Sequence, residues 1–130
     1  MPLKPDCFLG LCKHSGLNVV LKQDSSKWGA VFERALYHST SYLTSILDYH
    51  LEYQRGLGGE WRDLSCVVYS GDNPVAIWPL TLSDKNNVIN ISSQGRELLP
   101  PLFSKDCAPK TIKKINTAVQ KTIALICKKF

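Results

Sequence analysis

A short polar run at 92–96 holds the side chains best suited to ligand binding. It reads SSQGR and follows an apolar, strand-like segment. Hydroxyls, an amide and a guanidinium at the end of a strand can hold an anion or a carboxylate. An indole at position 78 could line an adjacent pocket, although an aromatic in a central strand is more often core. We therefore predict a ligand site formed by Trp78, Ser92, Ser93, Gln94 and Arg96, with an ordinary strand-to-helix connection as the alternative.

The chain shows no recognisable catalytic signature. Gly-x-Ser-x-Gly, His-Glu-x-x-His and phosphate-binding P-loop motifs are all missing from the sequence. Asp48 and Glu52 are spaced i, i+4, which suits a solvated acidic helix face because nothing else of a two-carboxylate site accompanies them. His50 lies near an apolar stripe, as expected of a half-buried histidine rather than a base. The sequence identifies no catalytic residue.

Five scattered cysteines, with no Cys-x-x-Cys pair, argue against a disulfide framework or a zinc site. Cys7, Cys12 and His14 could supply three ligands, but a fourth is not evident, so we predict no metal. The N-terminus lacks the basic start and long apolar core of a secretory signal. No apolar run approaches the roughly 20 residues of a membrane helix. These features favour a cytoplasmic protein with reduced thiols and no membrane span.

The net charge of +5 is concentrated at one end of the chain, where residues 105–130 hold seven lysines and one acid. Such a segment could bind nucleic acid or another anionic surface, and its candidate basic residues are Lys110, Lys113, Lys114 and Lys121. It contains no arginine and only a terminal aromatic, whereas nucleic-acid sites favour arginine forks and stacking rings. A solvated lysine face is the preferred interpretation, and nucleic acid is not the expected partner.

The hydrophobic pattern predicts one α+β domain. With 44% hydrophobic and 21% charged residues, 130 residues can build a globular core. We interpret residues 1–16 as a flexible lead-in and 17–130 as a single domain. Strands are predicted at 17–21, 64–69, 75–82 and 88–92, and helices at 28–37, 42–55 and 109–128. The order is β-α-α-β-β-β-α, with a mainly antiparallel sheet between helices.

Two finer expectations follow from local composition. Pro79 interrupts the predicted strand 75–82, and because proline cannot donate a ladder hydrogen bond it predicts a bulge, a bend or an edge. The second helix is expected to bury a stripe of Tyr42, Leu43, Ile46, Leu47, Tyr49, His50 and Tyr53.

This order resembles the first half of the Gcn5-related N-acetyltransferase (GNAT) fold. The helix at 28–36, the tyrosine-rich helix after it and the text Trp78-Pro79-Leu80 are similar to the N-terminal half-domain of Fem-type acyltransferases. A later Gly/Pro segment, from Gly95 to PLF at 101–103, adds to the likeness. The resemblance covers residues 25–128 and implies a GNAT-like half-fold.

The segment expected to hold the cofactor departs from the family pattern. A GNAT cofactor loop has the pattern Gln/Arg-x-x-Gly-x-Gly/Ala, whose glycines let N–H groups approach a pyrophosphate. Starting at Gln94, those places fall on Glu97 and Leu99; starting at Arg96, they fall on Leu99 and Pro101. We therefore expect no bound cofactor in this chain alone.

The GNAT fold also continues with further strands and a helix, which are absent after Phe130. Either a C-terminal half-domain is missing, or the chain closes its open sheet edge by forming a homo-oligomer. The expected function is a substrate-side or scaffold module without a complete acyl-CoA site. One alternative is an acyltransferase completed by a second subunit, which would bind acetyl-CoA. The other is a basic nucleic-acid-binding module.

Overall fold

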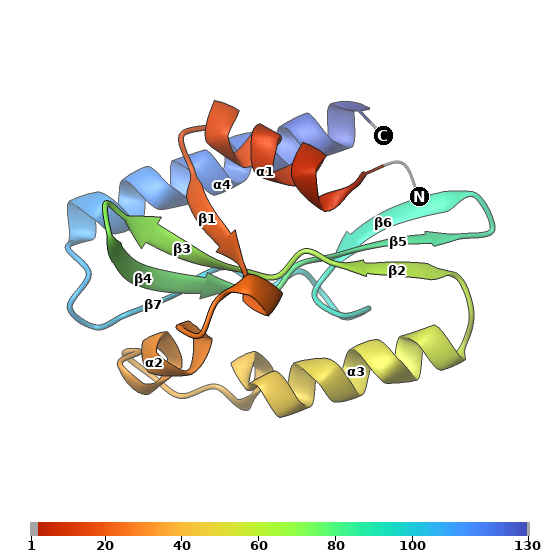
Figure 1. Cartoon of the computed structure of the whole chain (residues 1–130), viewed down its shortest axis with the longest axis horizontal. Helices are drawn as coiled ribbons and strands as arrows, with labels where there is room; N and C mark the ends of the chain where they lie inside the picture. Colours follow the sequence, from red (N-terminus) through yellow and green to blue (C-terminus); the bar gives the residue numbers. More distant parts are fainter. Residues whose placement is uncertain (1–2, 130) are drawn as a thin grey trace.

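A computed structural model describes residues 3–129 of the chain as an α+β fold with four helices and two small antiparallel sheets (Figure 1). Two single 3₁₀ turns, η1 (Lys22–Asp24) and η2 (Thr40–Tyr42), join the longer elements. The elements are α1 (Pro5–His14), β1 (Asn18–Leu21), α2 (Trp28–Glu33), α3 (Thr44–Gly56), β2 (Glu60–Asp63), β3 (Cys66–Ser70), β4 (Asn73–Trp78), β5 (Thr81–Lys85), β6 (Val88–Ser92), β7 (Leu102–Phe103) and α4 (Pro109–Lys129).

The two sheets are continuous through one long hairpin. One sheet has the order β1-β3-β4-β7 and the other β2-β5-β6. Asp63 faces Thr81 and Cys66 faces Trp78, so the register is the same on both sides of the interruption. The interruption lies at Pro79, as predicted, and separates β4 from β5. The predicted antiparallel meander is therefore present, but the sequence did not predict β2, which lies before the strand expected at 64–69, and the strand expected at 75–82 is divided at Pro79.

The third strand of the meander is also interrupted, by a longer insertion between β6 and β7. Ser92 at the end of β6 faces Thr81, whereas Leu102 in β7 faces Ile77. Ile77 and Thr81 are four residues apart, whereas their partners Leu102 and Ser92 are ten residues apart. The extra residues form an excursion at 93–101, which we call the 93–101 loop. It leaves the ladder beside Pro79, the residue that has no N–H to contribute.

Helices cover both faces of the sheet: α1 and α4 lie on one side, and α2 and α3 on the other (Figure 1). Alternate strand residues divide between two apolar clusters, as the period of two in a strand requires. Val68 and Trp78 belong to the cluster that includes α1 and α4, whereas Val67 and Ile77 belong to the cluster that includes α2. The central strands are thus buried on both faces.

The prediction of a flexible lead-in at 1–16 is wrong for the residues that the structure describes. Residues 5–14 form α1, and Leu3, Phe8 and Cys12 are fully buried. Phe8 and Cys12 are one turn apart, so they share one face of the helix. Phe8 packs against Trp78 with ring centroids 6.4 Å apart. The first two residues of the predicted lead-in, and Phe130, lie outside the described residues.

The predicted buried face of the second long helix is wrong at two positions. Helix α3 buries Leu47 and Leu51, while Tyr49 and Tyr53 are 65% and 56% exposed. The tyrosines lie about half a turn from the leucines, on the solvent side. Helix α2 also ends at Glu33, earlier than predicted, because the chain then extends and Ala35 forms a β-bridge with Ser104.

The other predicted elements are close to those observed. Strand β6 matches its predicted bounds, and β1 lies at a sheet edge. Helix α4 runs from Pro109 to Lys129 and buries Ile115, Val119 and Ile126 toward the sheet. None of the helices within 3–129 is long and apolar enough to cross a membrane.

Replacing the α1 anchor tests its place in the core. Phe8→Ala should lower the free energy of unfolding by about 3–5 kcal/mol, because it removes a fully buried ring and leaves a cavity. Urea denaturation followed by circular dichroism measures the change. Leu36→Ala is the control, since Leu36 is 78% exposed and its loss should change stability by no more than about 0.5 kcal/mol. Equal effects of the two substitutions would show that α1 is not docked.

Candidate functional site at the break in the sheet

The predicted polar run lies at the start of the 93–101 loop, where it meets the break at Pro79. Ser93 and Gln94 are fully buried, and Ser92 is nearly so. Their neighbours are Ser65, from the link between β2 and β3, and Thr81, the first residue of β5; both are buried. Ser65 and Thr81 were missed by sequence reasoning, since each is an isolated hydroxyl in or beside a strand and becomes notable only through its partners.

Thr81 connects β5 to both ends of the turn that follows β6. Its hydroxyl donates to the Ser92 carbonyl at 3.0 Å, accepts the Gln94 N–H at 3.0 Å, and lies 3.0 Å from the Ser92 hydroxyl. A hydroxyl has one proton and two lone pairs, so these three contacts use its full capacity. The Ser92 hydroxyl in turn accepts the N–H of Gly95 at 3.0 Å.

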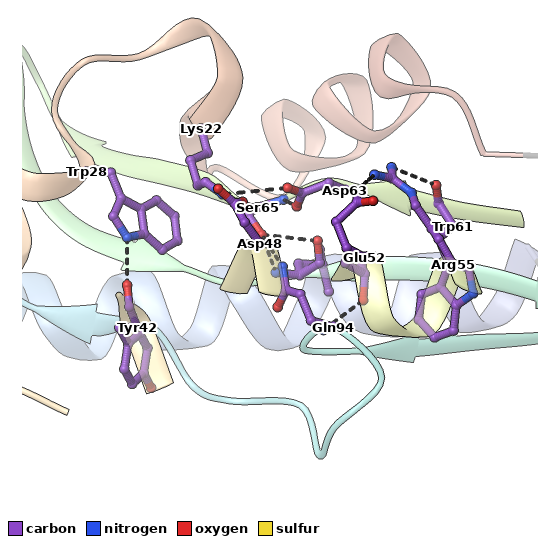
Figure 2. A network of polar contacts seen from close by, with 12 residues as sticks. Lys22, Trp28, Tyr42, Asp48, Glu52, Arg55, Trp61, Asp63, Ser65 and Gln94 are labelled. Carbon is purple, nitrogen blue, oxygen red and sulfur yellow. Dashed lines mark hydrogen bonds and ion pairs between the residues drawn. The ribbon is translucent and has the colours of Figure 1, made fainter. Parts of the chain in front are cut away.

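Two serine hydroxyls satisfy the backbone around Pro79. The Ser65 hydroxyl accepts the Leu80 N–H at 3.0 Å, and the Ser93 hydroxyl donates to the Pro79 carbonyl at 2.7 Å. Gln94 reaches across to Ser65, with its side-chain Nε2 3.1 Å from the hydroxyl oxygen (Figure 2). Buried backbone groups need partners, and here side chains supply them.

The turn itself requires a left-handed backbone. Gln94 has φ 54° and Gly95 has φ 83°, a region that glycine enters without steric cost. A Cβ added at Gly95 would lie 2.5 Å from the side chain of Gln54 on α3. The loop therefore lies close to the Gln54 side chain, and the positive φ favours glycine at position 95.

Five of the seven N–H groups of the loop, those of 93–96 and of Leu99, already have partners within the protein. Those of Gln94 and Gly95 donate to Thr81 and Ser92, that of Arg96 donates to the Ser93 carbonyl, and that of Leu99 donates to the Ser93 hydroxyl at 2.8 Å. The two prolines at 100 and 101 have no N–H. An anion cradle needs free N–H groups that converge on a ligand, and this loop directs its own inward.

A second set of contacts fixes the far end of the loop. The Tyr42 hydroxyl donates to the Pro100 carbonyl at 2.6 Å, and the Trp28 indole donates to the Tyr42 carbonyl at 2.8 Å. Figure 2 shows the indole of Trp28 directed at Tyr42. Burial raises the pKa of Tyr42 to about 12, so its phenol stays protonated and remains a donor. The loop is thus held at both ends.

Arg96 lies between the loop and α3 and is the one charged residue of the predicted site. Its Nη2 is 3.4 Å from the Ser41 carbonyl, and its Nε is buried without a hydrogen-bond partner among the described residues. The pKa of His50 is lowered, first by desolvation and then by the nearby Arg96 cation. His50 is thus biased toward its neutral form, in keeping with the half-buried histidine expected from the sequence.

Trp78 lies apart from the solvent-accessible part of this region. Its side chain is fully buried in the cluster below α1, and its indole N–H has no hydrogen-bond partner among the described residues. The structure therefore brings Ser92, Ser93, Gln94 and Arg96 together and places Trp78 in the core beside Phe8.

The segment that leads into the last helix differs from the predicted one. The sequence placed a cofactor-type loop at 94–101, directly before the helix, but β7 intervenes and residues 104–108 precede α4. This segment contains no glycine. Ser104 donates to the Asp106 carboxylate, which is the first cause of the lowered pKa of Asp106; a backbone hydrogen bond and the charges of Arg34 and Lys105 add to it. A carboxylate held in its charged form would repel a phosphate at this helix start.

The four predicted basic residues, Lys110, Lys113, Lys114 and Lys121, are all exposed on α4. At about 100° per residue, Lys110, Lys114 and Lys121 lie nearly in line, and Lys128 continues the row. We call these four residues the lysine row. The buried residues of α4 lie on the other side, so the row faces solvent.

A charged cluster around Lys22 was not predicted from the sequence. Lys22 Nζ lies 3.2 Å from Asp48 and 3.7 Å from Asp63, and 5.7 Å from the centre of the Trp28 ring. These residues come from η1, α3 and β2 (Figure 2), and their separation in sequence gives no pattern to detect.

The buried side chains of Ser65, Thr81, Ser92, Ser93 and Gln94 hold the loop in position, because their hydroxyls bind backbone groups. Within residues 3–129, none of these hydroxyls is hydrogen-bonded to a histidine. Comparisons with known protein families, with curated proteins and with solved structures find no match to this chain.

The tight fit at position 95 gives a direct test of the loop geometry. Gly95→Ala should lower the free energy of unfolding by about 1–3 kcal/mol, because φ is positive and the new methyl group meets Gln54. Gly10→Ala is the matched control in α1, where no atom lies within 4 Å of the added Cβ. It should stabilise the protein by about 0.5–1 kcal/mol through helix propensity. A neutral Gly95→Ala variant in thermal or urea unfolding would contradict the described turn.

Proposed function

We propose that this chain is a GNAT-like module, similar to the N-terminal half-domain of Fem-type acyltransferases, which acts as a substrate-side or scaffold domain and does not bind acyl-CoA by itself. The arrangement of elements supports the proposal. A strand, two helices, a three-line antiparallel meander and a long helix follow one another, with helices on both faces of the sheet. This is the order that the resemblance implies.

The closed 93–101 loop is the observation that carries the functional part of the proposal. Acyl-CoA sites of this type need backbone N–H groups that approach a pyrophosphate. Here the N–H groups of Gln94, Gly95 and Leu99 are taken by buried hydroxyls. The segment before α4 offers Asp106 in place of a glycine. Neither segment suits a polyanionic cofactor.

Isothermal titration of the purified chain with acetyl-CoA tests this proposal. We expect no saturable heat up to about 1 mM ligand, which corresponds to binding weaker than about −4 kcal/mol. A dissociation constant for acetyl-CoA in the micromolar range, measured on the monomer, would overturn the proposal. Thermal unfolding with and without 1 mM acetyl-CoA is an independent measurement, since a ligand that binds the native state raises the melting temperature.

The open strand edge supports one alternative, an acyltransferase completed by a second subunit. Strand β6 is the outer strand of its sheet, and within residues 3–129 no further strand pairs with it. An unpaired edge can accept a strand from another chain or from a second copy. Sedimentation velocity combined with the same titration separates the two functions. Acetyl-CoA binding that appears only with the associated species would favour the alternative.

The lysine row supports a second alternative, a nucleic-acid-binding module. From Lys110 to Lys128 it extends about 27 Å along α4, at 1.5 Å per residue. We expect only weak binding to a duplex at low salt, which disappears near physiological salt because point charges without arginine forks or aromatic rings give mainly counterion release.

Fluorescence anisotropy with a labelled DNA duplex and an RNA duplex, at several salt concentrations, measures this binding. Replacing Lys110, Lys113, Lys114 and Lys121 with Glu should abolish it. Binding that persists at physiological salt and is lost in the quadruple variant would establish the nucleic-acid function instead.

A further inference from the structure

We propose that a groove beside β2 binds a small ligand that carries an oxyanion group. The groove has a volume of about 570 Å³. Its lining includes three cationic residues, Lys4, Arg55 and Arg62, and two acidic residues, Glu60 and Asp63. The groove lies apart from the 93–101 loop, so this proposal does not depend on the GNAT-like function.

Four separate elements build the groove. Lys4 precedes α1, Gln23 lies in η1, Arg55 lies in the last turn of α3, and residues 60–63 form β2. Leu3 and Phe8 are fully buried on either side of the start of α1, which fixes the backbone at Lys4. A site assembled from docked elements holds its side chains in place before a ligand arrives.

Arg55 and Asp63 each have an ionic partner outside the groove lining. Arg55 is 3.1 Å from Glu52 through Nη1 and donates to the Trp61 carbonyl at 3.4 Å. Asp63 accepts the Ser65 N–H at 3.0 Å and lies 3.7 Å from Lys22. The lining as a whole holds three cationic and two acidic residues, so its net charge is +1.

Arg62 is the residue of the groove lining with a buried polar group that has no partner within residues 3–129. Its Nε is buried and has no hydrogen-bond partner within the described residues. Arg62 pairs with Leu82 across the sheet, so its side chain lies on the side of the α1 cluster, and Arg62 also lines the groove. A buried guanidinium N–H without a partner is unusual, and an oxyanion is the partner whose geometry matches the guanidinium fork.

The shape of the groove favours a small molecule over a polymer. Small-ligand sites measure roughly 300–1,000 Å³, and this groove falls within that range. The half-buried Trp61 lines it as well, and the indole N–H donates to the Gly58 carbonyl at 3.1 Å. The lysine row on α4, in contrast, is a convex line of point charges that would attract anions without enclosing them.

Nuclear magnetic resonance titration of the full chain tests the proposal. The probes are inorganic phosphate and succinate, at constant ionic strength, and the readout is the Trp61 indole N–H resonance, assigned with Trp61→Phe. We expect saturable shifts with at least one probe at millimolar concentration. Tighter binding of phosphate would assign a phosphate-bearing ligand, and tighter binding of succinate a carboxylate-bearing one. Linear, non-saturating shifts with both probes would overturn the proposal.

Matched charge variants separate a formed site from general attraction. Arg62→Gln should weaken binding at least tenfold, Lys4→Gln about threefold, and Lys113→Gln on α4 should leave it unchanged. Arg62→Lys keeps the charge but removes the fork, so it should restore only part of the affinity. Equal binding by Arg62→Gln and Lys113→Gln would overturn the proposal. If Arg62→Gln does not fold, Lys4→Gln and Arg62→Lys against Lys113→Gln give the same decision.

Discussion

The fold depends on how the sheet stays whole where Pro79 interrupts it. Proline contributes no N–H, so the ladder beside it cannot be completed by backbone alone. Three buried hydroxyls complete it instead: Ser65 takes the Leu80 N–H, Ser93 reaches the Pro79 carbonyl, and Thr81 joins both ends of the turn after β6. Because each of these oxygens is buried, a missing partner would leave an unsatisfied polar group in the core. The two small sheets remain one layer for this reason.

The same hydrogen bonds decide what the 93–101 loop can do. A loop beside a strand break is a natural place for a binding site, since its N–H groups are released from the ladder. In this chain the released groups turn inward and bind Thr81, Ser92 and Ser93. Structural completion of the sheet and capture of an external anion compete for the same donors, and here the sheet takes them. Buried guanidinium N–H groups without a partner within residues 3–129 remain at Arg96 in the loop and at Arg62 in β2.

Part of this architecture could be predicted from the sequence. Helix α4 and strand β6 have clear hydrophobic patterns with turn residues at their ends. Pro79 predicted the strand break because proline has no backbone N–H in any context. The order of the main strands and helices from β1 to α4 followed from the same signals, without β2 and β7, which were not predicted. Ligand binding at the polar run 92–96 stays a prediction; in the structure Ser92, Ser93 and Gln94 are buried and bind groups of the protein itself.

Other features could not be predicted because they depend on tertiary contacts. Helix α1 is short, and its burial of Phe8 is stabilised by Trp78, far along the chain. The tyrosines of α3 looked like core residues by composition, yet Leu47 and Leu51 fix which face is buried. Strand β7, which continues the third strand of the meander, has only two residues, too few to give a detectable pattern. Because β7 was not predicted, the segment that precedes α4 lies at 104–108 and not at the predicted place.

The side-by-side position of α1 and α4 has a consequence for the order of folding during synthesis. The cluster that contains Phe8, Trp78 and Val119 draws on both of these helices. Until α4 leaves the ribosome, α1 is the only long helix available to cover that face of the meander, and the residues that pack against α4 stay exposed. The opposite layer, built from α2 and the central strands, needs only residues up to β7 and can close first. A chain synthesised only as far as β7 would therefore hold every residue of one buried layer and lack α4 from the other, which is the surface a chaperone would find exposed.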